Sequence, residues 1–235
     1  MTKENIIETR HPRFNDEFFG FKDLENFFLS SIKNKKISNV YLLNGIKGVG
    51  KATLAYRVAR CLLNKINFNS LNDLNTKNIS DIFKKVANQT HPDLFVIESD
   101  LDKQKINLEK LQKLDKFVYG TPSESDYKVI IIDSLDDFTT QKNFSSLLKL
   151  LEDCPENCVF FLIAHTLHRI PLTIKSRCQN IYFSPISDTI LKKWFENSKL
   201  VKKENLDILL NLSNGSLGRA IEIINNNTIF NLYSS

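Results

Sequence analysis

Five short apolar runs constrain the fold of this chain more than any other feature of its sequence. Each run is continuous rather than alternating, which is typical of parallel strands covered on both faces. The segments between the runs carry apolar residues at helical spacing, and strands that alternate with helices predict right-handed crossovers and an open α/β sheet. The runs are residues 40–44, 94–98, 128–133, 159–164 and 180–183.

The pattern changes near residue 184. Pro185 interrupts it, no further strand is predicted, and three short stretches of helical periodicity follow before Ser235. A chain of 235 residues is long enough for one large and one small domain. We therefore expect an α/β domain over residues 1–184 and a small all-helical domain over residues 185–235.

The composition describes an ordinary globular protein. The net charge of +5 comes from dispersed basic residues, so we interpret it as solvated surface and not as a nucleic-acid patch. No apolar segment has signal-peptide or membrane-spanning length, so we expect a cytoplasmic protein without membrane contact. The four cysteines and four histidines lack the spacing of a zinc site, and the cysteines are too scattered for a disulfide framework.

A glycine-rich loop follows the first apolar run and opens a predicted helix, in the stretch "LLNGIKGVGKATLAYRVARCLL". Such a loop turns backbone N–H groups inward, and its lysine can reach terminal phosphates. Gly45, Gly50 and Lys51 fit the pattern G-x-x-x-x-G-K-[ST], but Ala52 stands where a hydroxyl should bind magnesium. Thr53 comes one residue late, which turns its side chain about 100° away from the loop.

Asp133 ends the third apolar run, where an acid helps to hold magnesium in nucleotide-binding proteins or caps the next helix. The following position is Ser134, whereas a hydrolytic protein of this type carries Glu there to polarise water. Serine is no general base without a partner, and the sequence places no histidine beside it.

Two arginines are candidates for phosphate contact. Arg177 stands just before the last apolar run, from which a guanidinium can reach the γ-phosphate of a neighbouring subunit. The alternative is a surface arginine or one paired within the chain. Arg219 follows Gly215 and Gly218 near the C-terminus, and taken alone it is a solvated helix residue.

In order along the chain, these pieces resemble the bacterial clamp-loader family of the AAA+ ATPases, and most closely its delta-prime branch. The resemblance covers nearly the whole chain. It implies an AAA+ P-loop domain with a five-stranded parallel sheet, followed by a small helical lid domain. The stretches that carry the resemblance include "NVYLLNGIKGVGKATLA", "HPDLFVIE", "SLLKLLEDCPENCVFFLIAH", "RIPLTIKSRCQNIYF" and "NGSLGRAI".

The resemblance also implies a role. The hydrolysing gamma/tau subunits of the family carry a hydroxyl, an Asp-Glu pair and a polar sensor where this chain has Ala52, Ser134 and Ala164. It therefore implies a stator of the DNA polymerase III holoenzyme without ATPase activity of its own, with Arg177 as an arginine finger in trans. The implied degenerate nucleotide site comprises Gly45, Gly48, Gly50, Lys51, Thr53, Asp133 and Arg219.

The implied partners are the gamma/tau and delta subunits and, through the complex, the sliding clamp and primer-template DNA. No cofactor is required, and whether the loop retains ATP or ADP stays open. Many relatives carry a four-cysteine zinc module after the P-loop helix; residues 64–89 contain no cysteine, so we expect no zinc. Relatives also continue into a third, collar domain, which we expect to be absent or reduced here.

Two rival functions stay open. One is an active clamp-loader ATPase that uses Thr53 in place of the missing hydroxyl. The other is a nucleotide-binding AAA+ module outside replication, because a fold does not determine a function.

Overall fold

The computed structural model describes residues 11–65, 73–74, 80–98, 108–138, 140–198 and 205–225. Its centre is one parallel five-stranded sheet in the order β2-β3-β4-β1-β5. This confirms the predicted α/β class and all five predicted strands, two of which begin one residue earlier than expected. The strands are β1 (Val40–Gly45), β2 (Leu94–Glu98), β3 (Lys128–Asp133), β4 (Cys158–Ala164) and β5 (Gln179–Phe183).

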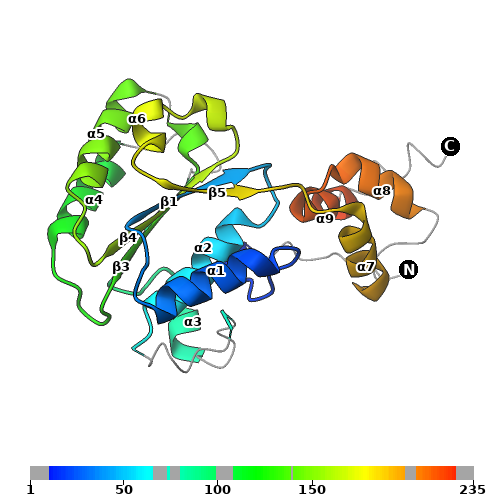
Figure 1. The fold of residues 1–235 in the computed structure, drawn as a ribbon, viewed down its shortest axis with the longest axis horizontal. Coiled ribbons are helices and arrows are strands. Elements are labelled where there is room, and N and C mark those ends of the chain that lie inside the picture. The colour runs from blue at the N-terminus through cyan, green and yellow to red at the C-terminus, as the bar shows by residue number, and fades with distance from the viewer. Residues whose placement is uncertain are drawn as a thin grey trace.

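Helices cover both faces of the sheet (Figure 1). Alternate residues of β1 divide between two apolar clusters: Tyr41 and Leu43 pack on the side of α1 and α2, whereas Val40 and Leu42 pack on the side of α4 and α5. This two-sided burial explains why the strands read as continuous apolar runs. The helices that follow or precede the strands are α1 (Lys22–Lys33), α2 (Lys51–Leu62), α3 (Ser80–Ala87), α4 (Leu108–Tyr119), α5 (Gln141–Glu152) and the short α6 (Leu172–Lys175).

Among the described residues of this part there are also three-residue 3₁₀ helices: η1 (Pro12–Phe14), η3 (Leu135–Asp137) and η4 (Leu167–Arg169). The predicted surface excursion over residues 64–89 contains α3, and most of its other residues lie outside the described ranges. None of the helices in the described ranges is long and apolar enough to cross a membrane.

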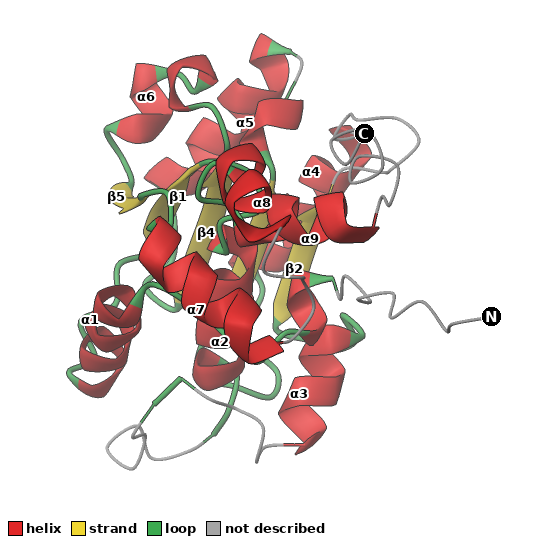
Figure 2. Cartoon of the chain, turned by 90° about the vertical axis from the view of Figure 1, so that its right-hand side faces the viewer, coloured by secondary structure: helices red, strands yellow, loops and turns green. Residues whose placement is uncertain are grey.

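In the described residues after β5 there are three α-helices, as the periodicity predicted: α7 (Asp188–Ser198), α8 (Leu206–Ser213) and α9 (Leu217–Asn225). They gather beyond the carboxyl end of β5, on the right in Figure 1, and Figure 2 shows them in front of the strands. That these helices form a separate domain from residue 185 stays a prediction.

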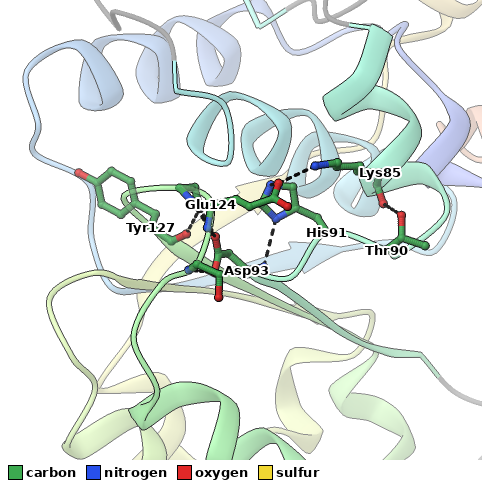
Figure 3. A network of polar contacts seen from close by, with 8 residues as sticks. Lys85, Thr90, His91, Asp93, Glu124 and Tyr127 are labelled. Carbon is green, nitrogen blue, oxygen red and sulfur yellow. Dashed lines mark hydrogen bonds and ion pairs between the residues drawn. The ribbon is translucent and has the colours of Figure 1, made fainter.

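A buried carboxylate just before β2 accepts hydrogen bonds from the turn that precedes β3 (Figure 3). Asp93, which is 1% exposed, accepts hydrogen bonds from the backbone N–H groups of Ser123, Glu124 and Ser125 at 2.6–2.8 Å and from the Ser125 hydroxyl at 2.9 Å. Burial opposes ionisation of this carboxyl, but the hydrogen bonds outweigh it and lower its pKa. His91 accepts from the Asp93 N–H at 3.1 Å. The "HPD" stretch thus holds the turn before β3 against β2.

Candidate functional site

The glycine-rich loop joins β1 to α2, as the sequence predicted, and α2 begins at Lys51. Gly45 has φ +148°, and a Cβ there would lie 2.4 Å from the carbonyl oxygen of Phe183 in β5. Only glycine fits so close an approach between two backbones. Gly48 and Gly50 also have positive φ. The loop therefore turns at the carboxyl edge of the sheet, the usual binding edge of an open α/β fold.

Lys51 is turned inward at the base of this loop and is 3% exposed. Its Nζ donates to the carbonyl oxygens of Gly45 at 2.6 Å and Ile46 at 2.7 Å. Burial lowers its pKa to about 8, while the carboxylates of Asp133 and Asp136 act in the opposite direction. The loop thus supplies its own acceptors for the lysine that the motif assigns to phosphate.

The three positions that lack the hydroxyl, the glutamate and the polar sensor of hydrolysing relatives lie around this loop. Ala52 and Thr53 are both buried in the first turn of α2. Ser134 follows β3, and its hydroxyl donates to Asp137 Oδ2 at 3.1 Å. Ala164 ends β4 and is fully buried. Because β3, β4 and β1 are parallel neighbours, their carboxyl ends bring these positions to one edge.

Asp133 lies at this edge, and its surroundings favour its neutral form. Burial raises the pKa of its carboxyl to about 6, Glu98 adds to the effect, and the Lys51 ammonium opposes it. Glu98 stands opposite Asp133 in the β2–β3 register and accepts a 2.6 Å hydrogen bond from the Tyr56 hydroxyl. Glu98 was not expected at this edge from the sequence, because its place there depends on which strand pairs with β3.

His165 is a second residue that sequence analysis missed. Its Nε2 lies 4.0 Å from Asp133 Oδ1, and its backbone N–H donates to Asp136 Oδ2 at 2.6 Å. Burial, and then the nearby Lys51 charge, lower its pKa to about 4, so the imidazole is neutral at pH 7. The available signal was its position directly after the apolar run that forms β4. Within the described residues, His, Cys, Asp and Glu side chains form no group of three suited to a metal ion.

The first turn of α9 packs directly on the loop. The Gly218 N–H donates to the Gly48 carbonyl at 2.9 Å, and the Ser216 hydroxyl donates to the Lys47 carbonyl at 2.8 Å. A Cβ on Gly218 would lie 2.9 Å from the Gly48 Cα, so the two backbones touch. The backbone N–H of Arg219 donates to the Ser216 hydroxyl at 3.2 Å, while the Arg219 side chain is exposed. The start of α9 is thus held on the loop by one backbone hydrogen bond and one hydrogen bond from a serine hydroxyl.

Arg177 lies away from all these residues, in the turn between α6 and β5. β5 pairs with β1 so that Phe183 stands beside Gly45 and Gln179 beside Tyr41. Arg177 is therefore at the amino edge of the sheet, about 13 Å or more from the loop at about 3.3 Å per strand residue. Figure 1 shows α6 and α9 at opposite ends of β5.

The Arg177 side chain is 38% exposed, and its guanidinium makes two polar contacts with other described residues. Its Nη2 lies 2.5 Å from Glu152 Oε1, and its Nη1 donates to the Thr173 carbonyl at 3.1 Å. The pairing within the chain that the sequence left open is therefore present, and a contact of Arg177 with a neighbouring subunit stays a prediction. The pair nevertheless leaves the guanidinium at the surface.

The parallel sheet order and the loop between β1 and α2 define an AAA+ type of fold. Among solved structures, this chain is similar to Thermotoga maritima RuvB, a Holliday junction branch migration motor, with a TM-score of 0.55 and 17% identity over 95% of this chain and 68% of that one. At that identity the likeness concerns the fold alone.

The sequence model of the family described as "DNA polymerase III, delta subunit" matches residues 21–187. Similar curated proteins include DNA polymerase III subunit gamma of Buchnera aphidicola subsp. Schizaphis graminum, 31% identical over 95% of this chain and 61% of that protein. Subunit gamma/tau of Mycoplasma genitalium is 29% identical over 87% of this chain and 34% of that protein. The chain belongs to the clamp-loader family of DNA polymerase III AAA+ proteins, and it spans between a third and three fifths of these relatives.

Proposed function

We propose that this chain is a delta-prime-type stator of a DNA polymerase III clamp loader. It does not hydrolyse ATP in its own site, and Arg177 completes the ATP site of a neighbouring gamma/tau subunit during loading of the sliding clamp. The observation that carries the proposal is the combination of a nucleotide loop without its catalytic groups and an exposed arginine at the opposite edge of the sheet.

The chemistry of the loop edge supports the first half of this proposal. Magnesium would have no hydroxyl ligand at Ala52, and the position directly after Asp133 carries serine in place of a carboxylate that would polarise water. The Ser134 hydroxyl is engaged by Asp137, and Ala164 offers no polar group. Lys51 and the loop N–H groups are the residues that would hold the phosphates of ATP or ADP, so the proposal allows residual binding without turnover and requires no cofactor.

The position of Arg177 supports the second half. Because its own loop lies at the far edge of the sheet, a phosphate that meets this guanidinium is not one bound at that loop, which supports a contact with the nucleotide of a neighbouring subunit. Three of the five guanidinium N–H donors have no partner in the contacts to Glu152 and Thr173, and these donors suit a phosphate. We infer that the partners are gamma/tau and delta subunits and, through the complex, the sliding clamp and primer-template DNA, and that the complex is cytoplasmic.

The test is an Arg177→Ala variant assembled with gamma/tau and delta subunits. An arginine finger supplied in trans is worth roughly 10³-fold or more in turnover, so DNA- and clamp-stimulated ATP hydrolysis should fall by that order. Arg169→Ala removes another exposed arginine of the same region and serves as the matched control. Unchanged turnover in Arg177→Ala would refute the proposal.

One observation favours a second candidate, an active gamma/tau-like ATPase: the curated relatives described above are named gamma or gamma/tau. In this case Thr53 would replace the missing hydroxyl, but it is buried in α2. ATP hydrolysis by the purified chain that disappears in Lys51→Ala would support this candidate over the stator.

A further inference from the structure

We propose that Glu152 is a positioning residue for Arg177: it orients the guanidinium for the phosphate of the neighbouring subunit. This inference rests on the proposed function. It assigns a role to a residue of the "LLKLLEDCPENC" stretch that the stator hypothesis leaves unused.

The two contacts of Arg177 determine the plane of its guanidinium. Glu152 Oε1 meets Nη2, the Thr173 carbonyl meets Nη1, and the acceptors come from different helices, α5 and α6. A planar fork held at both terminal nitrogens cannot rotate about its long axis without breaking one contact. The carboxylate therefore selects which N–H donors face outward.

Glu152 is well placed for this task because its helix is rigidly anchored. It is the last residue of α5, and Leu147, Leu150 and Leu151 on the preceding turns are buried in the core. Ile174 of α6 belongs to the same buried cluster. An exposed group attached to a buried element keeps its position, which is what a preorganised binding side chain requires.

The expected effect is small compared with the loss of the arginine itself. Glu152 and Arg177 are 42% and 38% exposed, so water screens their attraction. Exposed ion pairs are weak, and losing this one should lower turnover roughly two- to fivefold. The opposite arrangement, in which Glu152 withholds Arg177 from the neighbour, would raise turnover when the pair is broken.

The experiment compares Glu152→Gln with Glu156→Gln in the complex assembled with gamma/tau and delta subunits. Both variants remove one exposed carboxylate in the same region, and Glu156 makes no contact with Arg177 among the described residues. Glu152→Gln should lower kcat roughly two- to fivefold with little change in the KM for ATP. Glu156→Gln should leave both constants unchanged.

A double variant shows whether Glu152 acts through Arg177. In an Arg177→Ala background, Glu152→Gln should cause no further loss, because nothing remains to be oriented. A further loss there, or unchanged or raised turnover in the single Glu152→Gln variant, overturns the inference while the stator proposal stands. Unchanged turnover in Arg177→Ala overturns the stator proposal and this inference with it.

Discussion

The glycine-rich loop and the Arg177 turn lie at opposite edges of one sheet and differ in how their polar groups are satisfied. At the loop, Lys51 is buried and bonded to carbonyls of its own loop, and α9 covers the turn through Gly218. At the other edge, Arg177 is exposed and makes two contacts within the chain. Groups satisfied inside the chain contribute to the fold, whereas an exposed, partly satisfied guanidinium is suited to another molecule.

Burial also shifts the pKa values of side chains at the loop edge. The loop edge holds Lys51, Asp133 and His165, whose pKa values all shift toward the neutral forms because of burial. Such shifts couple proton binding to the free energy of unfolding.

The largest effect should be that of acid on the free energy of unfolding, through the buried groups at the loop edge. The unfolded chain protonates His165 near pH 6.5, but the folded chain does so only near pH 4, so stability present above pH 6.5 is lost as the pH falls through this window. The His165 contribution alone between pH 7 and pH 4.5 should be about 2 to 3 kcal/mol, which is the difference in acid sensitivity expected between the parent chain and His165→Gln. Asp133 acts in the opposite direction, because its folded-state pKa of about 6 makes the folded chain take up a proton first.

Urea unfolding at pH 7 and pH 4.5 measures this difference. His165→Gln should lose less stability in acid than the parent chain, because only the opposing contribution of Asp133 remains at that edge. His168→Gln, which changes an exposed histidine, is the control. Equal acid sensitivity of the parent chain and His165→Gln would show that burial of His165 does not govern the response.

The next largest effect should come from separating α9 from the loop. A Cβ added by Gly218→Ala would lie 2.9 Å from the Gly48 Cα and 3.0 Å from its carbonyl oxygen, so one backbone must move. Overpacking of this kind costs about 1 to 3 kcal/mol of unfolding free energy, measurable by urea denaturation. Glu222→Ala changes an exposed residue of the same helix and should have no comparable effect. If Gly218→Ala is as stable as the parent chain, α9 does not pack on the loop in solution.

The smallest change in unfolding free energy should come from a substitution at the edge that carries Arg177. Arg177→Ala removes an exposed ion pair and one hydrogen bond to a backbone carbonyl, so the unfolding free energy should change by about 0.5 kcal/mol or less. Urea denaturation of the isolated chain provides the measurement. A loss well above 1 kcal/mol would mean that Arg177 supports the fold, and the contrast between the two edges would no longer hold.

Local sequence patterns were sufficient for the five strands and for part of the site. The apolar runs predicted all five strands, and the spacing of Gly45, Gly50 and Lys51 placed the loop between β1 and α2. Asp133 was expected at the end of β3 and is found there. These predictions succeeded because each depends on residues that are neighbours in the chain.

The contacts that distinguish the two edges could not be predicted in this way. His165 beside Asp133, Gly218 on Gly48, and Glu152 beside Arg177 each join segments that are distant in sequence. Their proximity depends on strand order and helix packing, which arise from the burial of the whole core and leave no local pattern. By itself, the sequence determined that this chain forms a P-loop α/β fold with alanine, serine and alanine at positions 52, 134 and 164. Only the tertiary structure decided which charges meet, because burial and long-range packing set the distances between them.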